Sequence, residues 1–281
     1  MKNIFIAIFF ISLTSFAQDD LLNELDTNND DQEVVSAFKS VKIVNLESTK
    51  LVSKGDLFFV VAHRFDYVNS GIDEFFGLDN ANTQLKFIYG LSENIAIQLG
   101  RSSLQKTIDM GIKYNIIKQR NNGSPVAIVG FNSLAINTQM KKAQFPNMVF
   151  DNRLSFVNQL LISRKFSDKF TFQLAPTHFH ENTVLIDNQT NSQFALGLGG
   201  RYKLTNRLSL NLDYAAHLNR AQSSTFKNPL SIGLDLETGG HVFQLHFTNA
   251  RAMHESGFLG QTSGDFFKGD IAFGFNLVRV F

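Results

Sequence analysis

The sequence predicts an all-β fold, an antiparallel transmembrane β-barrel of about 12 strands. Three observations lead to this prediction. Segments of about nine to thirteen residues with alternating apolar and polar side chains recur from Gly55 onward. The links between these segments are alternately short and long. The last segment, 269–281, carries an aromatic row that lipid can cover, and its free edge can pair with the first strand.

Residues 1–17 have the features of a Sec-type signal peptide. Lys2 supplies the positive start, residues 4–11 the apolar core, and Ser15-Phe16-Ala17 a small-x-small cleavage site. This apolar core is too short for a membrane helix, and no other run approaches the ~18 apolar residues that such a helix needs. We therefore expect export without a helical anchor, with the cell outer membrane as the destination.

The segment 18–54 is predicted to be an acidic periplasmic tail. Residues 18–33 carry seven acidic side chains and no Lys or Arg, so we expect them to be solvated and mobile. The stretch 37–46 is more apolar, and it can form one strand or a short helix that enters the barrel as a plug. The predicted organisation is a signal peptide at 1–17, the tail at 18–54 and the barrel at 55–281.

Twelve alternating segments make up the barrel region. They are, approximately, 55–65, 82–91, 94–102, 106–118, 125–137, 152–165, 169–180, 192–204, 207–218, 228–237, 241–249 and 269–281. In the ninth, Leu208, Leu210 and Leu212 face one way and polar residues lie between them. Residues 57–62 of the first segment are apolar on both faces, so alternation does not orient this strand.

The connections carry a second signal. The tight turns lie at 92–94, 120–124, 167–168, 205–206 and 238–240, and the longer links lie at 66–81, 103–105, 138–151, 181–191, 219–227 and 250–268. Short periplasmic turns that alternate with longer extracellular loops are typical of bacterial outer-membrane barrels. An even number of strands places both termini on the periplasmic side.

A soluble β-sandwich or a lipocalin-like barrel is the alternative. Such folds bury the apolar row inside, and about eight strands are enough for them. Twelve strands would enclose a lumen too wide for Phe and aliphatic side chains to fill. With the apolar row outward, the interior becomes polar and suits a wet lumen, so we favour a barrel surrounded by outer-membrane lipid.

The final strand also resembles the C-terminal signal of bacterial outer-membrane proteins. Phe273, Phe275, Leu277 and the terminal Phe281 share one face of it. This resemblance implies that the outer-membrane assembly machinery recognises the strand that ends at Phe281.

Polar residues gather where the long links leave the strands. The predicted mouth cluster comprises His63, Arg64, Asp79, Asn80, Arg101, Ser102, Lys106 and Asp109. These residues either pair with one another and fix a loop, or form a ligand-binding or selectivity site.

A second set is predicted to face the lumen. It comprises Lys86, Lys113, Arg201, Lys203, Asp213, His217, Asp235 and His246. The basic members favour a mild preference for anions, which the acidic members oppose.

Several motifs resemble an uncharacterised family of bacterial outer-membrane β-barrel proteins. They are Gly55-Asp56-Leu57, His63-Arg64-Phe65, Phe76-Gly77-Leu78-Asp79-Asn80-Ala81, Tyr89-Gly90-Leu91, Gly100-Arg101-Ser102-Ser103 and Lys106-Thr107 with Asp109. The similarity is specific over about 55–118 and looser toward the C-terminus. It implies a β-barrel in the outer membrane, and it implies no reaction.

An enzyme is a weaker alternative. The chain has no cysteine, and the histidines do not converge: alternation places His217 and His246 in the lumen but His178 and His180 outside, so we expect no metal and no cofactor. Outer-membrane phospholipases are also twelve-stranded and use an outward Ser–His pair with an Asn. The run His180-Glu181-Asn182 lacks a nearby serine, so lipid hydrolysis is not favoured.

The sequence thus favours a passive channel or transport barrel for small solutes. The first alternative is a closed barrel with a binding or scaffold role, and the second is a lipid-modifying enzyme. The formal net charge of +1 gives no reason to expect a nucleic-acid partner.

Overall fold

The computed structural model describes residues 32–34, 37–143 and 145–281. The predicted signal peptide and most of the acidic tail lie outside the described residues. Within these residues, no helix is long and apolar enough to cross a membrane.

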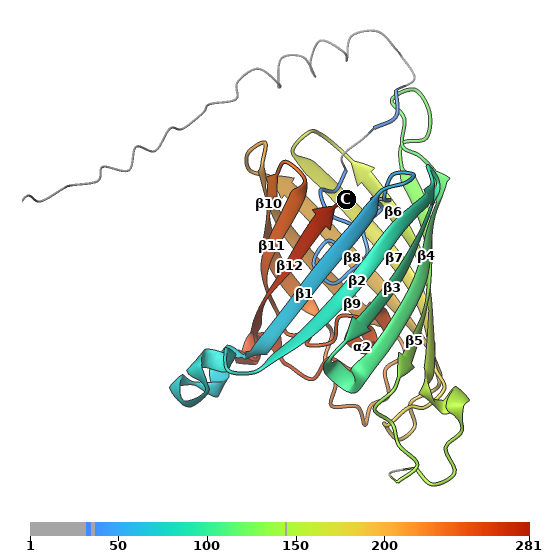
Figure 1. Cartoon of the computed structure of the whole chain (residues 1–281), viewed down its shortest axis with the longest axis vertical. Coiled ribbons are helices and arrows are strands. Elements are labelled where there is room, and N and C mark those ends of the chain that lie inside the picture. Colours follow the sequence, from blue (N-terminus) through green and yellow to red (C-terminus); the bar gives the residue numbers. More distant parts are fainter. Residues whose placement is uncertain (1–31, 35–36, 144) are drawn as a thin grey trace, which may run out of the picture.

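Twelve antiparallel strands close into one barrel, in which each strand pairs with its neighbours in the chain and β1 pairs with β12 (Figure 1). The strands are β1 (Leu57–Tyr67), β2 (Ala81–Ser92), β3 (Ile95–Ser102), β4 (Thr107–Ile117), β5 (Ala127–Asn137), β6 (Leu154–Lys165), β7 (Phe170–Glu181), β8 (Ser192–Lys203), β9 (Leu208–His217), β10 (Leu230–Thr238), β11 (His241–Thr248) and β12 (Ala272–Val280). The predicted strand count and antiparallel topology are confirmed.

The seam between β1 and β12 completes the ring. The pairing runs from Phe58 opposite Val280 to Tyr67 opposite Ala272, and its register shifts once after Arg64. At the rim, the backbone N–H of Phe281 donates to the carbonyl of Leu57 over 2.9 Å. The terminal residue therefore extends the pairing that closes the sheet.

Connections of two kinds alternate around the barrel. Links 93–94, 118–126, 166–169, 204–207 and 239–240 lie at the end where the C-terminus lies, which we call the turn end (Figure 1). Links 68–80, 103–106, 138–153, 182–191, 218–229 and 249–271 lie at the opposite, loop end. The loops contain short 3-10 helices at Val68–Ser70, Ile72–Gly77, Leu104–Lys106, Phe150–Arg153 and Phe266–Lys268. The predicted pattern of short turns and longer loops is confirmed for the other links, but the turn 118–126 is longer than the loop 103–106.

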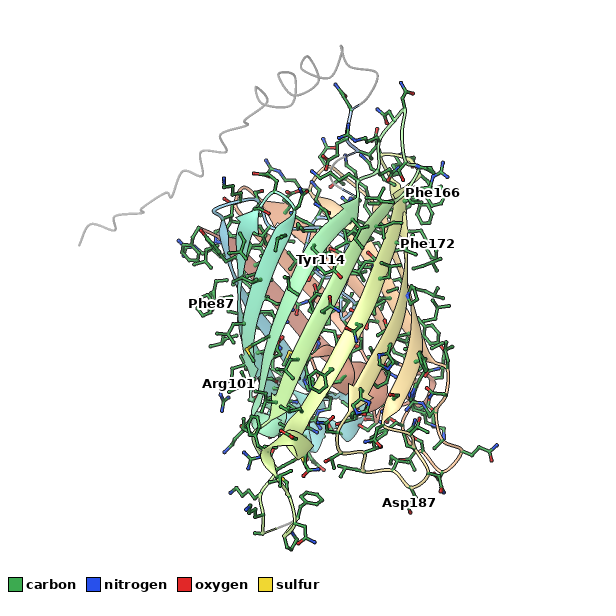
Figure 2. The ribbon with its side chains drawn as sticks, turned by 90° about the vertical axis from the view of Figure 1, so that its right-hand side faces the viewer. Phe87, Arg101, Tyr114, Phe166, Phe172 and Asp187 are labelled. Atoms are coloured by element: carbon green, nitrogen blue, oxygen red, sulfur yellow. The ribbon has the colours of Figure 1, made fainter. Side chains whose placement is uncertain are left out.

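The apolar row of each strand points outward. On β2, Leu85 and Phe87 are 46% and 50% exposed, whereas Gln84 and Lys86 are each 2% exposed. Figure 2 shows Phe87 and, at the loop-end part of β3, Arg101 pointing away from the wall. The outer belt is thus suited to lipid and the inner face is mostly polar.

Two segments of the same chain fill the interior. Residues 37–54, which we call the plug, enter from the turn end (Figure 1). Residues 249–262, the inward loop, enter from the loop end and carry the short helix α2 (Glu255–Gly260), whose residues are all buried. The core of the molecule therefore lies between the wall and these two segments.

Candidate functional site

The plug forms a small hairpin inside the barrel. The N–H of Ile43 donates to the carbonyl of Leu46 over 2.8 Å, and the N–H of Ser48 donates to the carbonyl of Val41 over 2.9 Å. These bonds close a tight turn over residues 43–46. The turn leaves its central N–H groups pointing at the wall, where they need acceptors.

Asp213 of β9 supplies that acceptor. Its Oδ2 accepts from the N–H groups of Val44, Asn45 and Leu46 over 3.0, 2.7 and 3.0 Å. A buried carboxylate needs such donors, because an isolated charge in this environment would be strongly unfavourable. Asp213 was predicted to line the lumen, and it lies there as the anchor of the plug.

Other strands hold the plug through side-chain hydrogen bonds. The amide of Asn45 donates to Ser231 and Thr248, and its Oδ1 accepts from Arg64 over 3.2 Å. On the opposite wall, the hydroxyls of Thr49 and Ser163 lie 2.7 Å apart. Four more wall side chains donate hydrogen bonds to backbone carbonyls of the plug. They are Gln173 to Glu47, Gln244 to Ile43, Asn276 to Val44, and Lys113 to both Val41 and Ser48. The polar inner face is largely occupied by hydrogen bonds to the plug.

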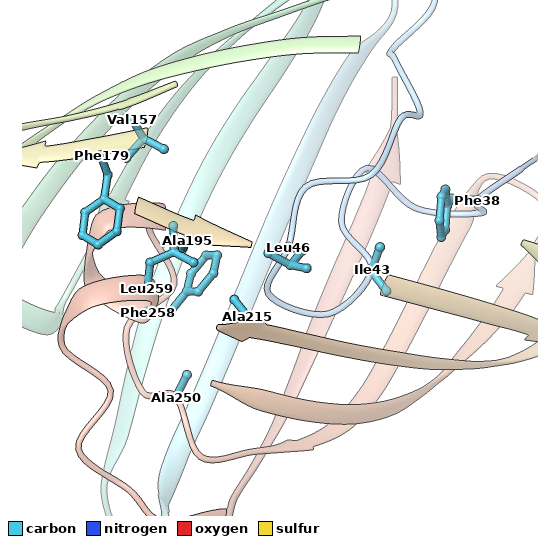
Figure 3. Packing of buried hydrophobic residues seen from close by; sticks show 10 residues of the cluster. All are labelled: Phe38, Ile43, Leu46, Val157, Phe179, Ala195, Ala215, Ala250, Phe258 and Leu259. Atoms are coloured by element: carbon cyan, nitrogen blue, oxygen red, sulfur yellow. The ribbon is translucent and has the colours of Figure 1, made fainter. Parts of the chain in front are cut away.

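Small residues on β8 make room for the apolar side of the plug. A Cβ atom on Gly199 would lie 2.2 Å from Cδ1 of Ile43, and one on Gly197 would lie 3.0 Å from Cδ1 of Leu46. Both plug residues belong to an apolar cluster that also includes Phe258 of the inward loop (Figure 3). The wall is therefore shaped to receive this hairpin.

A buried ionic network connects the plug, the wall and the inward loop. It comprises Lys42–Glu47, Lys42–Glu255, Lys113–Glu47 and Lys86–Asp109, with N···O distances of 3.2, 2.6, 2.6 and 3.0 Å. Burial alone would raise the pKa of Glu47, but the ammonium groups of Lys113 and Lys42 outweigh it and hold this pKa well below its usual range. The Glu47 carboxylate therefore stays charged.

His254 precedes α2 and is 4% exposed. Burial lowers its pKa to about 4, an effect that the charge of Asp109 opposes and those of Lys86 and Lys42 reinforce. His254 is thus neutral at pH 7 while the inward loop is in place.

The structure separates the predicted mouth cluster. Of its members, Arg64, Ser102 and Asp109 are buried in the lumen, where Arg64 donates to Asn276 and Asn45. His63 lies on the outward face and its ring stacks on that of Phe275 at 5.1 Å. Arg101 is exposed on the outward face of β3, and Asp79, Asn80 and Lys106 are exposed beyond the strands. These eight residues do not meet at one site.

Most of the residues predicted to face the lumen do lie inside the barrel. Lys86, Lys113, Arg201, Asp213, Asp235 and His246 are buried inside, Lys203 is partly exposed at the turn end, and His217 packs against Phe179. Sequence reasoning missed Lys42, Glu47 and Glu255, the partners that join the plug to the loop. Lys42 and Glu47 lie within the segment predicted as a plug, but only the apolar residues of that segment indicate burial from the sequence.

Little free space remains beside the plug. A cavity of about 20 Å³ is lined by Lys42, Arg64, Lys86 and Met253, among others, and has room for one water molecule. A wider space of about 460 Å³ opens at the turn end and is lined by Lys39, Lys50 and Glu237, among others. The passage through the barrel is filled at the level of the hairpin.

The outward face holds a Ser–His contact that the sequence spacing did not indicate. Nδ1 of His180 lies 3.0 Å from the hydroxyl of Ser192, which comes from the neighbouring strand β8. In the described part of the chain the other ring nitrogen has no hydrogen-bond partner, and Asn182 donates instead to the carbonyl of Asp151. The contact lacks the third group that orients the histidine in a hydrolase. No group of three or more His, Asp or Glu able to hold a metal is found among the described residues.

Comparisons with known proteins agree on the architecture. A family model described as "Membrane bound beta barrel domain (DUF5777)" matches residues 38–281. A search of proteins with curated functions finds no match.

Among solved structures, the NanC porin is similar with a TM-score of 0.51 at 8% identity, over 80% of this chain and 98% of that one. The KdgM porin has a TM-score of 0.49 at 6% identity, over 80% of this chain and 99% of that one. An outer membrane channel from Pseudomonas putida F1 has a TM-score of 0.45 at 13% identity, over 83% of this chain and 97% of that one. At such low identities the likeness concerns the fold alone.

Proposed function

The chain belongs to the family of membrane bound beta barrel domains (DUF5777), and from this premise we propose that it is a gated passage for small polar solutes through the outer membrane. In the conformation described here the passage is closed by the plug. Solute flow requires that the plug shift or withdraw toward the turn end, which we assign to the periplasm.

The observation that carries the proposal is the way in which the lumen is filled. Wall side chains can fill a narrow eight-stranded barrel, but wider barrels enclose a channel or a separate plug. Here a hairpin that belongs to no strand of the sheet fills a polar lumen, and it is bound through side chains rather than by strand pairing. Such a segment can leave without opening the sheet.

A disulfide lock tests the proposal. The chain has no cysteine, and the hydroxyls of Thr49 and Ser163 are 2.7 Å apart, so Thr49→Cys with Ser163→Cys places two sulfurs within bonding reach. In planar bilayers we expect the oxidised double variant to lose the current of the wild-type protein and to regain it on reduction. Each single-cysteine variant is the matched control and should be insensitive to oxidant.

A second variant should act in the opposite direction. Asp213→Asn removes the charge that holds three N–H groups of the plug, and we expect longer openings. A current that is equal in the oxidised and reduced lock would contradict gating by the plug.

The specific observation that favours a closed barrel with a binding or scaffold role is the presence of occupants from both ends. On that view the wild-type protein and Asp213→Asn show no current in bilayers although both are folded, and only a variant lacking residues 18–54 conducts. Current through the wild-type protein would exclude this role.

A further inference from the structure

The ammonium group of Lys42 lies where the two occupants of the barrel meet. It is 2.6 Å from Oε1 of Glu255 on α2 and 3.2 Å from Oε1 of Glu47 on its own hairpin. It also lies 5.7 Å from the centre of the Phe258 ring. The side chains of both glutamates are 1% exposed, so this contact is shielded from solvent.

The surrounding charges balance only while the inward loop is in place. The buried group comprises Lys42, Lys86 and Lys113 with Glu47, Asp109 and Glu255. Asp109 is paired with Lys86, and Glu47 is shared between Lys42 and Lys113. Without Glu255 the group therefore has one positive charge in excess, located at Lys42. An unpaired charge in a buried position is unfavourable and favours the uptake of an anion.

Of the two glutamates, Glu255 is the one that can be exchanged. Glu47 belongs to the hairpin, its carboxylate also contacts Lys113, and its backbone carbonyl accepts from Gln173 over 2.7 Å. In the described residues, the only ion pair of Glu255 is the one with Lys42. Glu255 leaves if the inward loop moves toward the loop end, whereas Glu47 stays with Lys42.

We propose that Lys42 is a binding site for the carboxylate of a small acidic solute, and that Glu255 occupies this site as a built-in competitor until the solute displaces the inward loop. The site is reached from the loop end, because the hairpin closes the other side. One carboxylate replaces another, so a singly charged solute restores the balance, whereas a doubly charged phosphate would overcompensate it. This inference rests on the proposed passage function and assigns its substrate class.

Hydrogen–deuterium exchange of the full-length protein in detergent tests this proposal without measuring current. Gluconate is the probe, and sorbitol is the uncharged match in which a hydroxymethyl group replaces the carboxylate. We expect gluconate to raise exchange in residues 253–262, because displaced backbone loses its protection, and sorbitol to have no effect. Equal responses to the two compounds, or none to either, would overturn the proposal.

Two substitutions locate the effect. Glu255→Gln keeps the shape of the side chain but replaces a charge-assisted hydrogen bond to Lys42 by a neutral one, so we expect the half-maximal gluconate concentration to fall about tenfold. Lys42→Gln should abolish the response. The matched control is Lys39→Gln, which removes another plug lysine whose ion pair is with Glu237 at the turn end and should leave the response unchanged.

The controls also separate this inference from the proposed function. If the disulfide lock gates the current but gluconate fails to act through Lys42, the passage stands and the carboxylate site is wrong. If gluconate acts as expected and no variant conducts, the barrel is a receptor for acidic solutes rather than a passage. A fall in the gluconate response with Lys39→Gln equal to that with Lys42→Gln would also overturn the assignment of the site.

Discussion

Single buried side chains decide how the plug and the inward loop are held. Asp213 does so with one carboxylate oxygen that gathers three backbone N–H groups, a stronger arrangement than three separate neutral hydrogen bonds. His254 acts in the opposite sense, because its burial keeps the imidazole neutral. Both residues make the closed form depend on a charge state.

The lowered pKa of His254 predicts that acid favours release of the inward loop. In the closed form its pKa is about 4, and in a released loop it returns to its ordinary 6.5. Between these values the released form binds more protons, so it gains stability as the pH falls and stops gaining below about 4. From pH 7 to pH 5 the ratio of released to closed loop should rise roughly twentyfold.

Conductance in planar bilayers at pH 7 and pH 5 measures this effect. His254→Asn lacks the titrating group and serves as the matched control, so its current should change little between the two values. An equal rise in the variant and the wild-type protein would assign the effect to another group.

At the scale of elements, β8 and the hairpin are shaped for each other. Gly199→Leu would place a large side chain in the position of Ile43, and overpacking of this kind costs about 1–3 kcal/mol. We expect the plug to be displaced and its shielded lysines, Lys39, Lys42 and Lys50, to become sites for trypsin in limited digestion.

Gly200→Leu is the matched control for that substitution. Gly200 lies on the outward row of the same strand, and a Cβ there has no atom closer than 3.9 Å, so the plug should stay protected. Protection of the plug from trypsin in both variants would show that β8 does not determine the position of the plug.

The strands were predictable from the sequence because lipid and polar lumen impose opposite demands on alternate residues. The exception was β1, whose inward residues Phe58 and Val60 are also apolar. The reason is packing: they contact Val41 and Val52 of the plug, so the strand is apolar on both faces. Alternation therefore failed where apolar side chains of the plug, rather than water or its polar groups, meet the wall.

The mouth cluster could not be derived in the same way. The sequence predicts this cluster only from the position of its residues near the strand ends, and it gives no face for β1. In the structure His63 faces outward and Arg64 faces inward. The partners of the buried charges come from the plug and the inward loop, far away in sequence. Only the closed barrel brings Lys42 and Glu255 together.

At the scale of the whole molecule, the barrel is closed by occupants from opposite ends. The hydroxyls of Ser155 on β6 and Ser256 on α2 are 2.8 Å apart, which offers a second lock that leaves the plug free. We expect oxidised Ser155→Cys with Ser256→Cys to abolish the gluconate response, because the inward loop can no longer leave.

The single-cysteine variants are the controls for this second lock. Comparison with the Thr49–Ser163 lock shows which occupant must move: if each lock alone stops the current, both occupants must move. Retention of the full current with the inward loop locked would mean that solutes pass beside α2.

The two occupants differ in charge. Residues 37–54 contain four lysines and one glutamate, a net charge of +3, whereas the inward loop, 249–262, contains one arginine and one glutamate and has no net charge. A transmembrane voltage therefore acts mainly on the plug, with up to about 2.3 kcal/mol per elementary charge for every 100 mV crossed. One polarity presses Lys42 toward Glu255 and the other draws the plug toward the turn end, so this barrel should behave as a rectifier.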